Sequence, residues 1–307
     1  MAITVVRAGM LTTVQDLGRW GHQHLGVPVA GPMDWYAHRL ANRLVGNPDD
    51  AAALEVTLIG PELATDAHVV CATAGAEFEL TAGGRSIVPG EAFELRAGER
   101  LRFGPCRAGC RATLAVAGGL AVPPVLGSRA TSLISRLGPF GGRALQAGDS
   151  LPVGTGPRRP PATGAVRLAP PAGGARLRVV PGPHEDRFAA GTVEDLPARR
   201  YVVTPESNRM GYRLEGPPIV HSGSADMLSD ATPVGSIQVP ASGLPILLMA
   251  DRQTTGGYPR IATVITADLP VAGQLAPGDW IEFVPCTRRQ AVEALRERVA
   301  ALQGLRP

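Results

Sequence analysis

A polar insert between two apolar runs holds the densest group of side chains in this sequence that could do chemistry. Residues 251–258 read Asp-Arg-Gln-Thr-Thr-Gly-Gly-Tyr, and Pro259 and Arg260 follow. The apolar run 246–249 and the β-branched run 261–266 on either side are both typical of strands. A turn needs only small turn-forming residues, so we interpret the insert as a loop that binds a carboxylate, carboxamide or carbamoyl group. The alternative is a hairpin whose polar groups bond only to its own backbone.

Two further clusters could contribute to such a site. Arg209 and Arg213 lie four positions apart, and in a strand this spacing would place both guanidinium groups on one face, where they could bind one anion. The alternative is a solvated strand face on which Arg213 pairs with a local acid. Near the N-terminus, a Gly-punctuated loop carries Gln15, Asp16 and Arg19.

Composition and missing motifs exclude several classes of function. The formal charge is only +3 over 307 residues, without a basic block, so we expect no nucleic-acid binding. No apolar run approaches the roughly 18 residues of a membrane span, and the first residues do not resemble a signal peptide, so we expect a cytoplasmic protein. Cys106 and Cys110 lack a second ligand pair, and His22 and His24 lack a third ligand, so we expect no metal site. No P-loop or Rossmann glycine motif is present.

The pattern of elements predicts a mainly β protein with a few short helices. Short strand candidates separated by Gly or Pro fill most of the chain, in agreement with its 38 Gly and 29 Pro. Asp34 predicts the start of a helix over 35–45, and Thr287 with Gln290 predicts a capping box before a C-terminal helix. We expect an N-terminal β domain over 1–155, a Gly/Pro-rich connector over 156–174 and a C-terminal β domain with a terminal helix over 175–307.

Several motifs in order give the sequence a family resemblance. They are Thr-Thr-Val-Gln-Asp-Leu-Gly-Arg at 12–19, Gly-Pro-Met-Asp at 31–34, Ser-Asn-Arg-Met-Gly-Tyr-Arg at 207–213 and Ala-Asp-Arg-Gln-Thr-Thr-Gly-Gly-Tyr-Pro at 250–259. The sequence resembles the biotin-dependent carboxyltransferase family, which includes the C subunit of bacterial ATP-dependent 5-oxoprolinase, allophanate-hydrolase subunit 2 and part of urea carboxylase. The resemblance implies two cyclophilin-like β-barrel domains and, as partners, the 5-oxoprolinase subunits B and A.

The resemblance also implies a reaction, in which 5-oxo-L-proline is cleaved to L-glutamate at the expense of ATP. ATP, with Mg, would be shared with the partner subunits, and biotin is used in carboxyltransferase relatives. The alternatives are carboxyl transfer to urea or a related amide, and a non-catalytic antagonist that binds a Kip-inhibitor-like partner.

We assign hypothetical roles to the candidate residues on this basis. Asp251 or Asp16 would accept a proton or orient a guanidinium group, and Gln253, Thr254 and Gln15 would orient the lactam amide. The substrate carboxylate or phosphoryl oxygens would be bound by Arg252, Arg209 and Arg213. Tyr258 would pack and donate a hydrogen bond, and Thr255 and Arg19 are further substrate-binding candidates.

Overall fold

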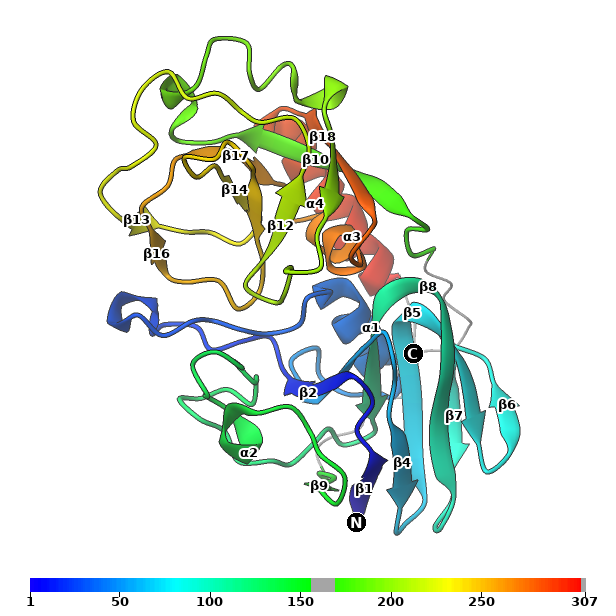
Figure 1. Cartoon of the computed structure of the whole chain (residues 1–307). Helices are drawn as coiled ribbons and strands as arrows, with labels where there is room; N and C mark the ends of the chain where they lie inside the picture. The colour runs from blue at the N-terminus through cyan, green and yellow to red at the C-terminus, as the bar shows by residue number, and fades with distance from the viewer. Residues whose placement is uncertain (156–168, 305–307) are drawn as a thin grey trace. The chain divides into compact units, whose positions relative to one another are not determined.

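The computed structural model describes residues 1–155 and 169–304, which form two compact units (Figure 1). Unit 1 comprises Met1–Arg19, Ala30–Pro170 and the chain end from residue 301, and unit 2 comprises Trp20–Val29 and Pro171–Ala300. Most of the predicted connector, 156–174, lies outside the described residues. No helix in the described part of the chain is long and apolar enough to cross a membrane.

Unit 1 is built on a nine-stranded antiparallel sheet that curves into a half-barrel. The main path runs β2-β3-β8-β4-β1-β9, and β5 pairs with β8 on one side and with β6 and β7 on the other. Figure 1 shows the two longest strands, β5 and β8, side by side. The strands are β1 Ala2–Arg7, β2 Leu11–Gln15, β3 Ala53–Thr57, β4 Glu62–Thr65, β5 Val69–Ala82, β6 Arg85–Ile87, β7 Ala92–Leu95, β8 Arg100–Val116 and β9 Ser150–Pro152.

The long strands β5 and β8 differ from the sequence prediction, which broke each of them in two. Strand candidates 69–73 and 76–81 form the single strand β5, and candidates 100–103 and 111–116 form β8. Gly75 and the Gly104-Pro105 pair do not end these strands, because register shifts between β5 and β8 at residues 75–80 absorb the irregular backbone.

Helix α1, Trp35–Leu44, covers one face of this sheet and confirms the predicted helix. The Asp34 carboxylate accepts a hydrogen bond from the backbone N–H of Ala37 at 2.8 Å, as an N-cap should. Gly46 follows the helix end with φ of 74°, the left-handed conformation that glycine adopts without strain. Leu40 and Leu44 are fully buried against alanines of β5 and β8.

Unit 2 is a closed barrel of seven strands in the order β10-β17-β14-β15-β12-β11-β18 (Figure 1). Its pairs are antiparallel except for β10 with β18. Tyr201, Tyr212 and Phe283 are fully buried within the unit. The barrel strands are β10 Gly174–Pro181, β11 Arg200–Val203, β12 Gly211–Glu215, β14 Ser236–Gln238, β15 Ile246–Leu248, β17 Arg260–Val264 and β18 Trp280–Pro285; β13 Asp230–Ala231 and β16 Thr255–Gly256 form a separate ribbon.

The helices outside α1 are short except for the last one, so the predicted mainly β class is confirmed. Helix α4, Arg288–Gln303, begins with the predicted capping box: Gln290 Oε1 accepts from the Thr287 backbone N–H at 2.9 Å, and the Gln290 N–H donates to Thr287 Oγ1 at 3.2 Å. The other helical turns are η1 Gln23–Leu25, α2 Pro139–Gly142, η2 Glu185–Arg187, η3 Leu196–Ala198 and α3 Leu269–Gly273.

Candidate functional site

The polar insert of unit 2 is a crossover and not a hairpin turn. Strands β15 and β17, which flank the insert, do not pair with each other, because β14 lies between them and pairs with both. The insert therefore passes the end of β14, and its residues Thr255–Gly256 form β16 on the way. The alternative of a self-contained hairpin is wrong, because the polar groups of the insert bond to other segments of the chain.

One of those segments is the strand β13 with the residue that follows it, Thr232. The Thr232 N–H donates to the Thr254 carbonyl at 3.0 Å, and the Thr232 hydroxyl donates to the Gln253 carbonyl. In return, Arg252 Nε donates to the Thr232 carbonyl at 2.6 Å. These bonds add to the β13–β16 pairing, so hydrogen bonds to the segment 230–232 fix the backbone of the insert.

Arg209 forms a buried ion pair with Asp251, the first residue of the insert. Arg209 Nε and Nη2 donate to the two Asp251 carboxylate oxygens at 3.1 and 3.0 Å, and the side chains are only 3% and 1% exposed. Asp251 thus orients a guanidinium group, one of the two roles expected of it. Arg209 precedes β12 while Arg213 lies within it, so the prediction that both arginines share one strand face is wrong.

Arg252 differs from Arg209 because it has no carboxylate partner among the residues that the structure describes. Its guanidinium group bonds to the carbonyls of Thr232 and Met249. Burial lowers the pKa of Arg252 to about 10, which leaves it protonated at neutral pH. A partly buried cation that bonds only to neutral carbonyls is electrostatically suited to an anionic partner.

Part of the insert borders a groove of about 670 Å³ within unit 2. Gln253 and Tyr258 come from the insert, Arg213 from β12 and Gln238 from the end of β14. Arg213 is exposed and forms no ion pair of 4.0 Å or less in the described chain, but its charge is one of the causes that lower the pKa of Glu206, so a local acid does lie near it. The groove is also lined by Thr204, Glu206, Asn208, Glu215, Ser242 and Leu244, among others.

Two glutamine amides meet at the wall of this groove. Gln253 Nε2 donates to Gln238 Oε1 at 3.3 Å, and Gln238 Nε2 is buried without a hydrogen-bond partner in the described structure. A Cβ atom on Gly256 would lie 2.4 Å from Gln238 Nε2. The first glycine of the pair therefore makes room for a side-chain amide. Thr254 and Thr255 are not among the residues that line the groove, and their backbone pairs with residues 231 and 232.

The three candidates near the N-terminus lie in unit 1 and bond to a different segment. Asp16 accepts from Ser128 Oγ at 2.6 Å, and Gln15 Nε2 donates to the Thr131 carbonyl at 3.1 Å. Arg19 donates from Nε to the Val125 carbonyl at 2.8 Å and from Nη2 to the Ala130 carbonyl at 2.9 Å. All three side chains are buried and hold the loop 125–131; none lines the groove of unit 2.

Sequence reasoning missed a group of charged residues beside β16. Arg260 forms an ion pair with Asp230 and bonds to the Ala231 carbonyl. The Arg260 backbone N–H donates to His184 Nδ1 at 3.2 Å, and His184 Nε2 lies 4.0 Å from Asp230 Oδ2. Burial, and then the positive charge of Arg260, lower the pKa of His184. Residues so far apart in sequence carry no local signal for this contact. Locally, the Asp230 side chain accepts a hydrogen bond from the Ala231 backbone N–H at 2.7 Å.

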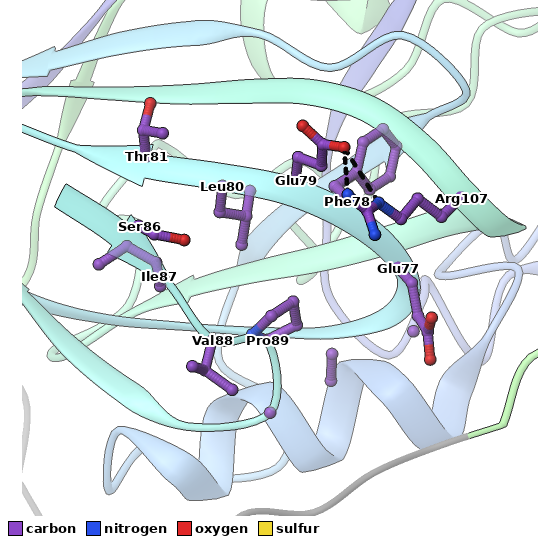
Figure 2. A pocket seen from close by; sticks show the side chains of 13 residues that line it. Glu77, Phe78, Glu79, Leu80, Thr81, Ser86, Ile87, Val88, Pro89 and Arg107 are labelled. Atoms are coloured by element: carbon purple, nitrogen blue, oxygen red, sulfur yellow. Dashed lines mark hydrogen bonds and ion pairs between the residues drawn. The ribbon is translucent and has the colours of Figure 1, made fainter. Parts of the chain in front are cut away.

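Unit 1 has a pocket of its own, of about 410 Å³, between β5 and the segment 86–90 (Figure 2). Leu80, Ile87, Val88 and Pro89 give it an apolar lining, and a Glu79–Arg107 ion pair of 2.6 Å stands at its edge. It contains none of the candidate residues. No group of three or more His, Cys, Asp or Glu residues that could hold a metal ion occurs in the described ranges.

Comparisons with known proteins place this architecture in a family. Residues 25–285 match the carboxyltransferase domain, subdomain A and B. The chain is 40% identical to the 5-oxoprolinase C subunit of Escherichia coli over 96% of this chain and 95% of that protein, and 34% identical to the 5-oxoprolinase C subunit of Haemophilus influenzae over 96% and 94%. The structure of Kluyveromyces lactis urea amidolyase superposes with a TM-score of 0.93 at 33% identity, covering 99% of this chain and 20% of that one. The resemblance predicted from the motifs is confirmed, and the chain belongs to the carboxyltransferase family that includes the C subunit of 5-oxoprolinase.

Proposed function

We propose that this chain is the C subunit of an ATP-dependent 5-oxoprolinase, which helps cleave 5-oxo-L-proline to L-glutamate. The observation that carries the proposal is its similarity to 5-oxoprolinase C subunits over nearly the whole length of both chains, together with a groove that suits the substrate. The substrate class is a small carboxylate that also contains a lactam. Its recognition needs a cation for the carboxylate and oriented amide groups for the lactam.

The amide pair of Gln238 and Gln253 supplies the lactam contacts in this proposal. A lactam presents one N–H donor and one carbonyl acceptor, and a primary amide offers both complementary groups. The partnerless Nε2 of Gln238 is a donor that lacks an acceptor in the described structure, and the Gln253 amide borders the groove directly. A substrate carbonyl that accepted from this pair would gain negative charge during ring opening, when oriented donors contribute most.

Two arginines share the negative charge of the substrate. Arg213 lines the groove and is exposed, so it is placed to contact the carboxylate directly. Arg252 adjoins Gln253 in the insert and is partly buried, so its positive charge is less screened by solvent than that of Arg213. We assign Arg213 to binding and Arg252 to stabilisation of charge that develops at the reacting amide.

The groove does not suit the triphosphate of ATP. Its cation, Arg213, is accompanied by the carboxylates of Glu206 and Glu215, which repel a polyanion. We therefore assign ATP and its Mg to the partner A and B subunits, and we derive no step through ATP on this chain. The proposed contribution of this chain is to bind, orient and polarise the lactam.

The test is reconstitution with the purified A and B subunits. The complete complex is expected to produce glutamate from 5-oxoproline only when ATP is present, and omission of this chain is expected to abolish the product. Equal glutamate production without it would contradict a catalytic role and favour the antagonist that binds a Kip-inhibitor-like partner.

Carboxyl transfer to urea or a related amide is the second candidate, favoured by the close superposition with urea amidolyase. The ureido ring of biotin presents the same N–H and carbonyl groups as a lactam, so Gln238 and Gln253 would be the residues to hold it. Biotin would supply the carboxyl group when bound. Carboxylation of urea by this chain with a carboxylated biotin carrier, and no glutamate formation with the A and B subunits, would replace the first proposal with this one.

A further inference from the structure

His184 lies beside the end of the polar insert of unit 2 but does not line the groove. Its side chain is only 15% exposed. The Arg260 backbone N–H donates to Nδ1 at 3.2 Å, so Nδ1 carries no proton. In the neutral ring the proton is therefore on Nε2, which lies 4.0 Å from Asp230 Oδ2. The neutral imidazole thus accepts a bond from β17 and carries its proton on the side of β13.

Arg260 connects His184 to the ribbon of β13 and β16 (Figure 1). It is the buried first residue of β17, and its guanidinium group forms an ion pair with Asp230 and donates to the Ala231 carbonyl. These two residues make up β13, which pairs with β16 of the insert. The register between β14 and β17 shifts next to Arg260, so His184 supports a strand start at which the ladder is irregular.

The residue after β13, Thr232, connects this contact to the insert. Its N–H donates to the Thr254 carbonyl, and its hydroxyl donates to the Gln253 carbonyl. Its own carbonyl accepts from Arg252 Nε. Arg252 and Gln253 are the residues to which the proposed function assigns charge stabilisation and a lactam contact. A displacement of the segment 230–232 would therefore move both of them.

A proton on Nδ1 of His184 would break the contact with Arg260. An imidazolium ion has two N–H donors and no acceptor, so its Nδ1 would face the backbone N–H donor to donor. The charged groups near the ring are Arg260 of β17, Asp230 of β13, and Asp186 and Arg187 of η2. Burial and the charge of Arg260 lower the pKa of His184, in agreement with a neutral ring at neutral pH. The contact is therefore complete at neutral pH and is lost on acidification.

We propose that His184 is a positioning residue for the insert. Its neutral imidazole fixes Arg260, and through the ion pair of that residue it fixes the segment 230–232. That segment in turn places the side chains of Arg252 and Gln253. The consequence for catalysis rests on the proposed function, whereas the consequence for the backbone of this segment does not.

The experiment removes or replaces the acceptor in the full-length chain. His184→Ala removes it, and His184→Asn keeps it, because the amide Oδ1 takes the place of Nδ1 and does not titrate. In the chain alone near pH 7, hydrogen exchange of the Thr232 N–H is expected to be about 10-fold faster in His184→Ala. In His184→Asn it is expected to stay within about 2-fold of the wild type.

His221→Ala is the matched control for the loss of a partly buried histidine. His221 also lies in unit 2, and its Nε2 is 3.1 Å from the Pro240 carbonyl. It makes no bond to the segment 230–232 in the described structure. Its removal is therefore expected to leave exchange of the Thr232 N–H unchanged, even where it lowers Tm.

The reconstituted complex distinguishes positioning from a general loss of stability. His184→Ala is expected to lower kcat about 10-fold, because the insert residue Arg252 is displaced. KM for 5-oxoproline is expected to stay within about 2-fold of the wild type, because Arg213 lies on β12, which pairs with β11 and β15 and not with β13. His184→Asn is expected to restore kcat.

A pH series gives an independent readout, which serves even if His184→Ala does not fold. When the segment opens, the pKa of His184 returns toward 6.5, so the open form binds a proton that the closed form does not. Protection of the Thr232 N–H in the wild type is therefore expected to fall as the pH decreases from about 7 to about 5. The fall is expected to be smaller in His184→Asn.

Wild-type exchange at Thr232 in His184→Ala would overturn the proposal, and so would equal pH profiles for the wild type and His184→Asn. Faster exchange with unchanged kcat would also overturn it, because the insert would then tolerate the displacement. Absence of glutamate from the wild-type complex would instead contradict the proposed function. The exchange measurements, made on the chain alone, would still decide whether His184 positions the insert.

Discussion

The polar cluster of unit 1 and the polar insert of unit 2 contain the same kinds of side chain in opposite situations. In unit 1, Gln15, Asp16 and Arg19 bond to backbone and hydroxyl groups of a single loop. In unit 2, Arg252 has no carboxylate partner in the described chain, and Gln253 borders a groove. The contrast indicates that a polar motif acts as a clamp where its side chains bond to one loop, although Gln15 Oε1 is buried without a partner in the described structure, and can act as a site where side chains such as Gln253 border a groove.

Unit 2 contains both situations within three residues. Asp251 is paired with Arg209, Arg252 bonds to the Thr232 and Met249 carbonyls without lining the groove, and Gln253 borders the groove. The buried pair anchors the start of the insert, and the ribbon with β13 fixes its middle. The available groups are thus mounted on a rigid support, which a binding site needs if its geometry is to be maintained.

The largest expected effect is on stability, from Asp251→Ala. Arg209 would be left as a buried charge with its carboxylate removed, which costs about 3–5 kcal/mol of unfolding free energy. Urea denaturation of unit 2, followed through tryptophan fluorescence, measures the loss. The double variant Arg209→Met, Asp251→Leu is expected to recover most of it, because no charge remains unpaired. Wild-type stability in Asp251→Ala would show that the pair is not an anchor.

A paired test of arginines, one from each unit, addresses the contrast directly. Arg252→Ala is expected to lower glutamate production by the reconstituted complex roughly 100-fold or more, and also to cost about 1 kcal/mol of unfolding free energy, because the Thr232 and Met249 carbonyls lose their donor. Arg19→Ala is expected to cost about 2 kcal/mol of unfolding free energy, because two carbonyls lose their donors. Thermal unfolding and turnover are measured on both variants. Full turnover in Arg252→Ala would remove this residue from the site and leave the groove to Arg213 and the amides.

Much of the fold could be predicted because its signals are local. The Asp34 cap and the Thr287–Gln290 capping box each act within a few residues, and both were recognised in the sequence. The breaks predicted in β5 and β8 were wrong, because glycine and proline end isolated strands, whereas here register shifts against a long partner accommodate them. That partner is distant in sequence, so the compensation has no local signal.

The candidate site was likewise predictable only where its signals are local in sequence. The insert was selected from its residue types, and two of its side chains, those of Gln253 and Tyr258, line a groove. Gln238 was not selected as a site residue, because its approach to the insert depends on barrel order and on the space left by Gly256. Arg209 and Arg213 were placed on one face by counting positions, yet β12 begins only at Gly211. Position counting is valid only inside a strand.

The pH dependence of stability offers a test of unit 1. Burial lowers the pKa of His38 from 6.5 to about 4, although the charge of Asp16 opposes the shift. Between these values the unfolded chain binds a proton that the folded chain does not, so stability is complete above pH 6.5 and is lost as the pH falls toward 4. The loss between pH 7 and 5 should be about 2 kcal/mol. Urea midpoints measure it, and His38→Gln is expected to flatten the profile; an unchanged profile would place the titration elsewhere.

The smallest expected effect separates binding from catalysis within the groove. Arg213 is exposed on β12 and lines the groove, so Arg213→Ala is expected to leave the unfolding free energy within about 0.5 kcal/mol of the wild type. If its guanidinium group binds the substrate carboxylate equally in the ground and transition states, KM for 5-oxoproline rises about 5-fold to 10-fold while kcat is unchanged. Arg7→Ala, another exposed arginine but in unit 1, is the matched control and should alter neither constant. A fall in kcat at constant KM would instead assign Arg213 to the transition state, and the division of roles between Arg213 and Arg252 would have to be reversed.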